Sequence, residues 1–211
     1  MVYLWTVIYG LCTAGAVFFS RKRFLSLPSS GRRFWLEMLG SAAGGALVGW
    51  LVQLRVGENP TAALRLLIAA AALAGAARCD IQVRRIPNLF AAAMLGGFLL
   101  CTALDGWLQP QTALPGLVGG VLGGAVIYLF LRLCQRISHG GIGGGDIKLA
   151  GSLVCLVGMY GGFSVLLFAQ LSALAAAAIL LLLHKITIKG SIPFAPFFFL
   201  GLAITVWVGS F

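Results

Sequence analysis

Long apolar stretches, separated by short polar loops, follow one another along the whole chain. Eight of them cover residues 2–20, 35–54, 61–78, 87–106, 113–133, 146–159, 162–184 and 193–210. A helix needs about 20 apolar residues to cross a bilayer core of about 30 Å. The sixth stretch is shorter, so we expect it to begin inside a glycine-rich re-entrant turn or to tilt at the bilayer edge. The pattern predicts an all-α polytopic transmembrane bundle of about eight spans.

Lysine and arginine residues lie mostly on one side of this predicted bundle. Of the 15 basic residues, 13 lie in loops or span ends after the first, third, fifth and seventh stretches. They are Arg21, Lys22, Arg23, Arg32, Arg33, Arg78, Arg84, Arg85, Arg132, Arg136, Lys148, Lys185 and Lys189. Arg55 and Arg65 fall on the other side. Because cytoplasmic loops carry the excess of Lys and Arg, the asymmetry supports eight spans and places both termini on the non-cytoplasmic side.

The overall composition agrees with a membrane protein. The chain has 211 residues, of which 60% are hydrophobic and 9% charged, whereas soluble domains carry roughly 25% charged residues. The net charge of +10 does not indicate a nucleic-acid partner, because the basic residues lie in short loops between apolar stretches. The basic cluster Arg21–Arg23 follows the first stretch instead of preceding it, so we expect this stretch to remain as a helix and not to be a cleaved signal peptide.

Small side chains recur at helical spacing in the second and fifth stretches. These glycines are Gly40, Gly44, Gly45, Gly49, Gly116, Gly119, Gly120, Gly123 and Gly124. Small residues three or four positions apart let helices approach closely in lipid, so we expect them to pack helices and assign them no chemistry. The five cysteines form no C-x-x-C pair, so neither a disulfide framework nor a zinc site is predicted.

Five acidic residues are present, and the predicted topology sorts them into two groups. Glu58 and Asp105 fall on the non-cytoplasmic side, and Glu37 lies near the cytoplasmic start of the second span. Asp80 ends the third span and Asp146 begins the sixth, which places both at the cytoplasmic face. Apolar stretches and loop charges therefore predict two aspartates at the same membrane depth.

Two carboxylates at one site are typical of aspartic-protease chemistry. Like charges a few ångströms apart cannot both ionise readily, so one pKa rises and the pair shares a proton. The ionised member can deprotonate a water molecule while the protonated member polarises a peptide carbonyl. The glycines of residues 140–145 would let a substrate backbone approach Asp146.

A simpler interpretation is equally open from spacing alone. Each aspartate could be an interfacial residue that pairs with a nearby cation: Asp80 with Arg78 or Arg84, and Asp146 with Lys148. An aspartate at the start of a helix is also favoured by the helix dipole without any catalytic role.

Three short motifs shift this balance. Asp80 begins a D-x5-I-P-N sequence that ends at Asn88, residues 143–149 read G-x-G-D-x-K-L, and residues 192–197 read I-P-F-A-P-F. In this order they resemble the type IV prepilin peptidases, the G-x-G-D class of aspartic membrane proteases. The resemblance covers roughly residues 61–211, so residues 1–60 would add two N-terminal spans to one membrane peptidase domain of residues 1–211.

The resemblance implies the activity and its residues. The protein would cleave the basic leader of prepilin-like or pseudopilin-like substrates at the cytoplasmic face of the bacterial inner membrane, within the machinery of type IV pili or protein secretion. Asp80 and Asp146 match the catalytic pair, and no redox cofactor or catalytic metal is implied. The other matched positions would shape the loop, the helix starts or the surroundings of the site, and they are Gly143, Gly145, Lys148, Pro87, Asn88, Pro193 and Pro196.

The chain departs from the larger bifunctional members of this family after its first span. Those members carry a cytoplasmic insert, often with paired cysteines that hold a metal, and they also methylate the new N-terminus. Here the loop runs only from Arg21 to about Phe34 and has no cysteine. The sequence therefore does not support N-methyltransferase activity.

Other polar residues receive weaker assignments. Acidic Glu37 is the best candidate for recognition of a basic leader. His139 is expected to be a solvated loop residue, His184 an interfacial residue and Cys79 a packing residue beside Asp80. The basic loop of residues 21–33 is expected to contact anionic lipid.

Two other functions compete with peptidase activity. A proton-coupled transporter or channel would place its carboxylates near the bilayer midplane, whereas both aspartates are predicted at one face. A non-catalytic assembly subunit would explain the glycines but not the paired aspartates within three motifs. The sequence predicts no oligomeric state.

Overall fold

The computed structural model describes residues 2–25, 32–56, 59–138, 141–184 and 192–209. The described part contains helices and no strand, which confirms the predicted all-α bundle. Its elements are α1 (Val2–Ser20), the π-helical turn η1 (Arg21–Leu25), α2 (Arg32–Arg55), α3 (Pro60–Val83), α4 (Asn88–Leu108), α5 (Pro110–Ile137), α6 (Gly144–Val157), α7 (Met159–Leu182) and α8 (Ala195–Val208). Each predicted apolar stretch therefore corresponds to one α-helix.

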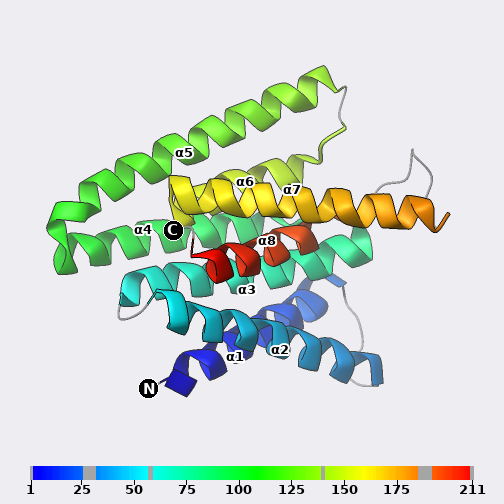
Figure 1. The fold of residues 1–211 in the computed structure, drawn as a ribbon, viewed down its shortest axis with the longest axis horizontal. Helices are drawn as coiled ribbons and strands as arrows, with labels where there is room; N and C mark the ends of the chain where they lie inside the picture. Colours follow the sequence, from blue (N-terminus) through cyan, green and yellow to red (C-terminus); the bar gives the residue numbers. More distant parts are fainter. Residues whose placement is uncertain (1, 26–31, 57–58, 139–140, 185–191, 210–211) are drawn as a thin grey trace.

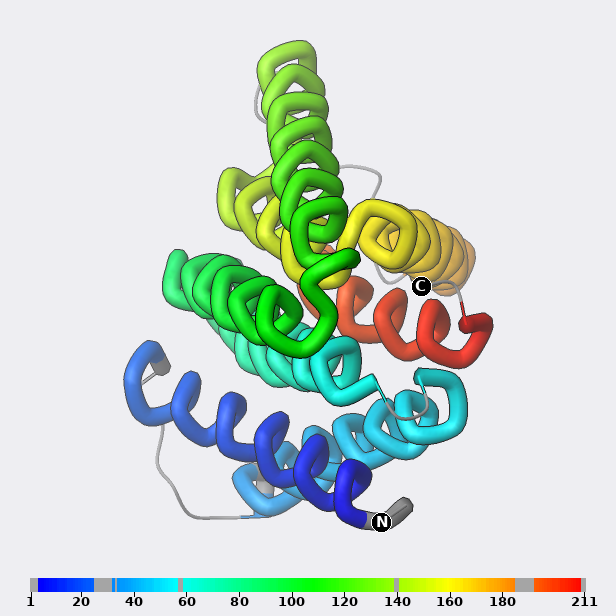
Figure 2. The backbone as a smooth tube through the Cα atoms, turned by 90° about the vertical axis from the view of Figure 1, so that its left-hand side faces the viewer, coloured from blue at the N-terminus to red at the C-terminus, as the bar shows by residue number. Residues whose placement is uncertain are grey.

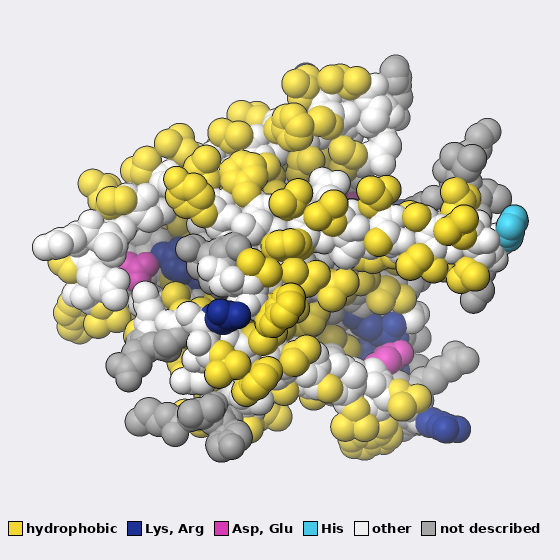
Figure 3. Space-filling view, viewed as in Figure 1, with side chains coloured by type: hydrophobic (Ala, Val, Ile, Leu, Met, Phe, Trp, Pro, Cys, Tyr) yellow, Lys and Arg dark blue, Asp and Glu magenta, His cyan; other side chains and the backbone are white. Residues whose placement is uncertain are grey.

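Six of the described helices are long and apolar enough to cross a membrane, namely α1 to α5 and α7. The other two, α6 and α8, have 14 residues each, which corresponds to about 21 Å of helix. The short sixth stretch is thus a short helix, as its length predicts. The face of the molecule shown in Figure 3 is largely hydrophobic with few charged side chains, as expected for contact with lipid.

Helix α3 lies at the centre of the bundle (Figures 1 and 2). It contacts α1, α2, α4, α6 and α8, and its alanine-rich sequence buries Ala69, Ala70, Leu73 and Ala76 completely. Helix α6 packs against α3, α4, α5 and α7, with Leu149, Leu153 and Leu156 fully buried. The two helices that carry Asp80 and Asp146 are therefore the best buried in the molecule.

Glycines bring several helix pairs into close contact. A Cβ added to Gly45 would lie 2.0 Å from Thr13 Oγ1 of α1, and one added to Gly124 would lie 2.1 Å from Cys155 Sγ of α6. Gly49 and Gly120 are similarly crowded, which confirms the predicted packing role for these four. Gly40, Gly116 and Gly119 face open space, so the prediction does not hold for every glycine in these stretches.

Two ion-pair clusters connect helices at opposite ends of the bundle. At the end that carries Asp80 and Asp146, which we call the motif end, Glu37 of α2 accepts from Arg21 and also from Arg78 Nη2 at 2.7 Å. At the other end, Arg65 of α3 donates to Asp105 Oδ2 of α4 at 2.6 Å and to the Leu156 carbonyl oxygen of α6 at 3.0 Å. The first cluster joins the α1–α2 pair to α3, and the second joins α3 to the final turn of α6.

Candidate active site

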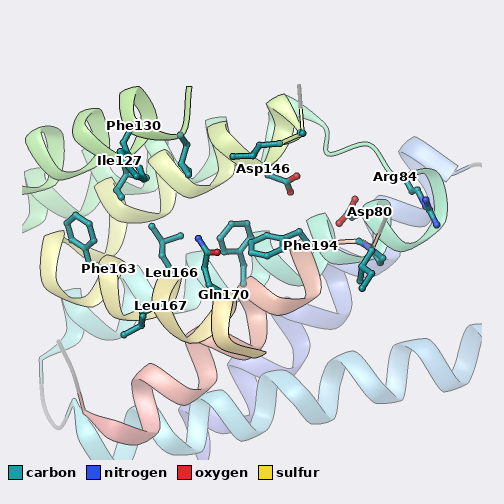
Figure 4. Close-up of a pocket in the computed structure, with 17 residues that line it drawn as sticks. Asp80, Arg84, Ile127, Phe130, Asp146, Phe163, Leu166, Leu167, Gln170 and Phe194 are labelled. Atoms are coloured by element: carbon teal, nitrogen blue, oxygen red, sulfur yellow. The ribbon is translucent and has the colours of Figure 1, made fainter. Parts of the chain in front are cut away.

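All three motifs meet around one cavity at the motif end. The cavity has a volume of about 870 Å³, and Asp80, Asp146, Gly143, Pro193 and further residues from α5 and α7 line its wall. Asp80 lies in the last turn of α3 and Asp146 in the first turn of α6. Their carboxylates are turned towards one another at one end of the cavity (Figure 4). The structure thus brings together two side chains that lie 66 positions apart in the sequence.

Helix ends position the two aspartates. Helix α3 stops at Arg84, which adopts the left-handed conformation (φ 51°) and donates its backbone N–H to the carbonyl oxygen of Asp80 at 3.0 Å. Pro87 then caps α4, so the chain turns away directly after the Asp80 helix. Gly143 precedes the first residue of α6, which puts Asp146 at the third helical position.

Asp80 is 7% exposed and receives a hydrogen bond from another helix. The backbone N–H of Ala195, the first residue of α8, donates to Asp80 Oδ2 at 2.9 Å. The first N–H groups of a helix have no partner within the helix, and the helix dipole favours negative charge there. The I-P-F-A-P-F motif therefore supplies a donor that stabilises a negative charge on Asp80.

Asp146 has different surroundings. It is partly buried, and its Oδ1 atom is buried without a hydrogen-bond partner among the described residues. Burial, together with the nearby negative charge of Asp80, raises the pKa of Asp146 to about 6. A buried carboxylate without a donor favours its protonated form. The two carboxyl groups thus differ in their hydrogen bonding, because Asp80 accepts the N–H of Ala195 and Asp146 Oδ1 has no donor among the described residues.

The simpler ion-pair interpretation is not what the structure contains. Arg78 pairs with Glu37, and Lys148 Nζ donates to Asn88 Oδ1 at 3.0 Å. Arg84 lines the cavity, but within the described residues neither aspartate forms a salt bridge. The Lys148–Asn88 hydrogen bond instead joins the second turn of α6 to the first residue of α4.

The glycines of the G-x-G-D motif have unequal surroundings. A Cβ on Gly143 would lie 2.6 Å from Asp146 Oδ2, and one on Gly145 would lie 3.0 Å from the Cβ of Ile86. Gly144, between them, has no neighbour within 4 Å of an added Cβ. Gly143 therefore leaves room for the Asp146 carboxylate, and Gly145 lets α6 approach the loop that contains Pro87.

The remaining predicted residues separate into those near the cavity and those away from it. Pro193 lines the cavity, whereas Pro196 is the second residue of α8 and does not. Glu37 lies outside the cavity wall, where its two arginine partners neutralise it. His139 lies outside the described residues. Cys79 is fully buried and His184 is exposed.

Sequence reasoning missed two parts of this site. Ala195 lies within the third motif, but the prediction concerned only the adjacent prolines and not its backbone N–H. Its position one residue before Pro196 was the available signal, because proline is favoured in the first turn of a helix, where N–H groups lack partners. The apolar part of the cavity, between α5 and α7, carried no motif at all.

The fold and the site together define a polytopic helical membrane protein with two facing aspartates, one buried and one partly buried, at one end of its bundle. A sequence model of the type IV leader peptidase family matches residues 66–182, which is more than half of the chain, and the chain belongs to this family. It is an integral membrane protein.

Two curated relatives are similar over part of their length. A prepilin leader peptidase/N-methyltransferase of Bacillus subtilis (strain 168) is 32% identical over 120 residues, which cover 56% of this chain and 44% of the relative. A protein of the same name from Dickeya chrysanthemi is 27% identical over 175 residues, which cover 77% of this chain and 61% of the relative. The chain thus spans about half of the length of these relatives. No solved structure gives a significant match.

Proposed function

We propose that this protein is an aspartic endopeptidase that removes the basic leader from prepilin-like substrates, with Asp80 and Asp146 as the catalytic pair. The observation that carries the proposal is the shared cavity, in which two aspartates from α3 and α6 face one another in unlike surroundings. Membership of the type IV leader peptidase family and the names of both relatives support the substrate class.

The unlike surroundings assign a role to each aspartate. Asp80, which accepts the Ala195 N–H, is the ionised base that takes a proton from water as the water oxygen attacks the scissile carbonyl carbon. Asp146, with its pKa raised to about 6, is the acid that donates its proton to the carbonyl oxygen. When the C–N bond breaks, Asp80 gives the proton that it accepted to the leaving nitrogen, and one hydroxyl of the tetrahedral diol returns its proton to Asp146 as the new carboxyl group forms, so the pair again holds one proton.

The proposed orientation places the motif end at the cytoplasmic face of the inner membrane. The excess of Lys and Arg in the loops on this side supports the orientation, and a basic leader would be retained there for the same reason. The proposal treats residues 1–211 as one peptidase domain, since α1 and α2 pack against α3. Membrane lipids and prepilin-like substrates are its partners.

Only the peptidase part of the relatives' names is proposed for this chain. The segment between α1 and α2 has no cysteine, so nothing in it matches the metal-holding insert of the bifunctional family members. A transporter function is less well supported, because both aspartates lie at helix ends on one side of the bundle and not midway along it.

The test is cleavage of a prepilin-type peptide by the protein reconstituted in lipid vesicles. Asp80→Asn and Asp146→Asn should each lower kcat by at least about a hundredfold, the usual size of an acid–base contribution. Glu58→Gln is the matched control, because it removes a carboxylate that the sequence predicts on the non-cytoplasmic side, and it should leave kcat near that of the wild type. Cleavage by either active-site variant at the rate of this control would exclude the proposed pair.

A further inference from the structure

The cavity that contains Asp80 and Asp146 continues as an apolar cleft between α5 and α7. Its walls there are Ile127, Phe130 and Leu131 from α5 and Phe163, Leu166 and Leu167 from α7. Helix α5 leans away from α7 towards the motif end (Figures 1 and 2), so the two helices do not close on one another. Phe130 and Leu167 are more than half exposed, although each faces a cavity that reaches the two carboxylates.

One polar side chain interrupts this apolar wall. Gln170 is exposed on α7 and directs its amide into the cleft (Figure 4). It is the twelfth of the 24 residues of α7, which is the most apolar of the candidate spans. Gln170 therefore lies about halfway across the predicted membrane span.

The amide of Gln170 has no hydrogen-bond partner within the described residues, unlike the two serines of its helix. Ser164 donates to the Tyr160 carbonyl oxygen at 3.1 Å, and Ser172 donates to the Ala169 carbonyl oxygen at 2.9 Å. A polar group at membrane depth without a partner is costly, and such residues generally mark a functional position. The cleft thus combines an apolar surface with one free donor and one free acceptor.

We propose that this cleft binds the apolar segment that follows the scissile peptide of the substrate, and that Gln170 hydrogen-bonds to the backbone of this segment. The proposal rests on the proposed peptidase function. A peptide can reach the carboxylates only if its backbone unwinds near the scissile bond, and the unwound N–H and C=O groups then need partners inside the membrane. Gln170 offers both a donor and an acceptor to such a backbone, and the leucines and phenylalanines around it offer the apolar surface.

The continuity of the cavity argues for a substrate segment rather than a lipid chain. One cavity contains both the carboxylates and the apolar walls. A substrate segment bound in the cleft would therefore hold the peptide bond that precedes it close to the two carboxylates. A lipid chain would gain the apolar contacts but would leave the Gln170 amide unpaired. The cleft therefore suits an occupant with an apolar sequence and a peptide backbone.

The test compares two substrates on protein reconstituted in vesicles. The long peptide contains a basic leader, a glycine and an apolar segment of about 20 residues, and the short peptide lacks the apolar segment. Leu167→Trp fills the cleft and should lower kcat/KM for the long peptide by at least about tenfold, with no change for the short peptide. Gln170→Leu should lower kcat/KM for the long peptide alone, by about threefold to tenfold, the effect of one hydrogen bond.

Leu174→Trp is the matched control. Leu174 is an exposed leucine on the same helix, two turns beyond Leu167, and it does not line the cavity. The proposal is wrong if Leu167→Trp cleaves the long peptide as well as Leu174→Trp does, or if it impairs both peptides equally. It also fails if Gln170→Leu behaves as the wild type. These failures differ from failure of the peptidase function, in which Asp80→Asn would remain active on both peptides.

Discussion

The two glycines that flank Gly144 in the G-x-G-D motif have distinct physical tasks in this molecule. Gly143 leaves space for the carboxylate of Asp146, and Gly145 allows contact with the loop before α4, whereas Gly144 contacts nothing that an added methyl group would disturb. The spacing of the motif therefore reflects two separate close approaches around the start of α6. Single alanine substitutions can distinguish the effects of these two close contacts.

The three glycines should respond differently to alanine. Gly143→Ala places a methyl group 2.6 Å from Asp146 Oδ2, so we expect the carboxylate to shift and kcat to fall by about tenfold or more while the protein stays folded. Gly145→Ala presses on Ile86 and should lower the free energy of unfolding by about 1–3 kcal/mol. Gly144→Ala is the control and should resemble the wild type. Peptide cleavage and thermal unfolding in detergent measure the two effects, and equal activity of the Gly143 and Gly144 variants would contradict this account.

The protonation of Asp146 should be visible in the pH dependence of cleavage. Its pKa is raised to about 6, so the protonated acid is present below that pH and is lost as the pH rises through it. We therefore expect kcat/KM to decline with an apparent pKa near 6 that belongs to the carboxyl pair.

The free energy of unfolding should also depend on the proton that Asp146 binds. The folded state holds it more tightly than the unfolded chain, whose aspartates titrate near 3.9. The free energy of unfolding should therefore decrease as the pH rises from about 4 to about 6. Asp146→Asn should remove this part of the slope. A wild-type slope that persists unchanged in Asp146→Asn would show that another group is responsible.

At the scale of the helices, α6 is held at both of its ends. Near its start, Lys148 donates to Asn88 of α4, and in its last turn the carbonyl oxygen of Leu156 accepts from Arg65. Arg65 also pairs with Asp105, and both side chains are 14% exposed. A cation at the C-terminal end of a helix is favoured by the dipole, so Arg65 acts as a cap for α6.

Removing this cap should destabilise the protein. Arg65→Ala leaves the Asp105 carboxylate without its cation, and breaking a buried pair in this way costs about 3–5 kcal/mol. The double variant Arg65→Met, Asp105→Leu removes both charges and should recover most of the lost stability. Denaturant unfolding in detergent measures the difference. A double variant that is no more stable than Arg65→Ala would show that the pair is not the source of the stability.

At the scale of the whole molecule, the sequence predicted the position of each residue across the membrane better than it predicted which helices pack against one another. Apolar stretches and charge asymmetry located every helix and placed Asp80 and Asp146 at the same end of the bundle. Hydropathy varies along a helix axis, so it does not say which helices lie side by side. Hydropathy therefore could not predict that Arg78 pairs with Glu37 or that Arg65 pairs with Asp105.

The chemistry of the site was predictable only where side chains carry it. The motifs selected both aspartates, but the donor to Asp80 is a backbone N–H that no residue type encodes. The cleft between α5 and α7 consists of ordinary leucines, isoleucines and phenylalanines. It becomes recognisable only when the directions of the two helices are known. In the sequence, Gln170 is an isolated polar residue in an apolar span, and only the structure shows that it faces the cleft.

The contact between Ala195 and Asp80 also has a consequence for biosynthesis. Both carboxylates have been synthesised once residue 146 has been added, but the N–H that stabilises charge on Asp80 comes 49 residues later. A nascent chain that has not yet reached α8 holds two aspartates without the difference that assigns their roles. In the proposed mechanism, the order of synthesis thus completes the acid–base pair only after α7 has been made.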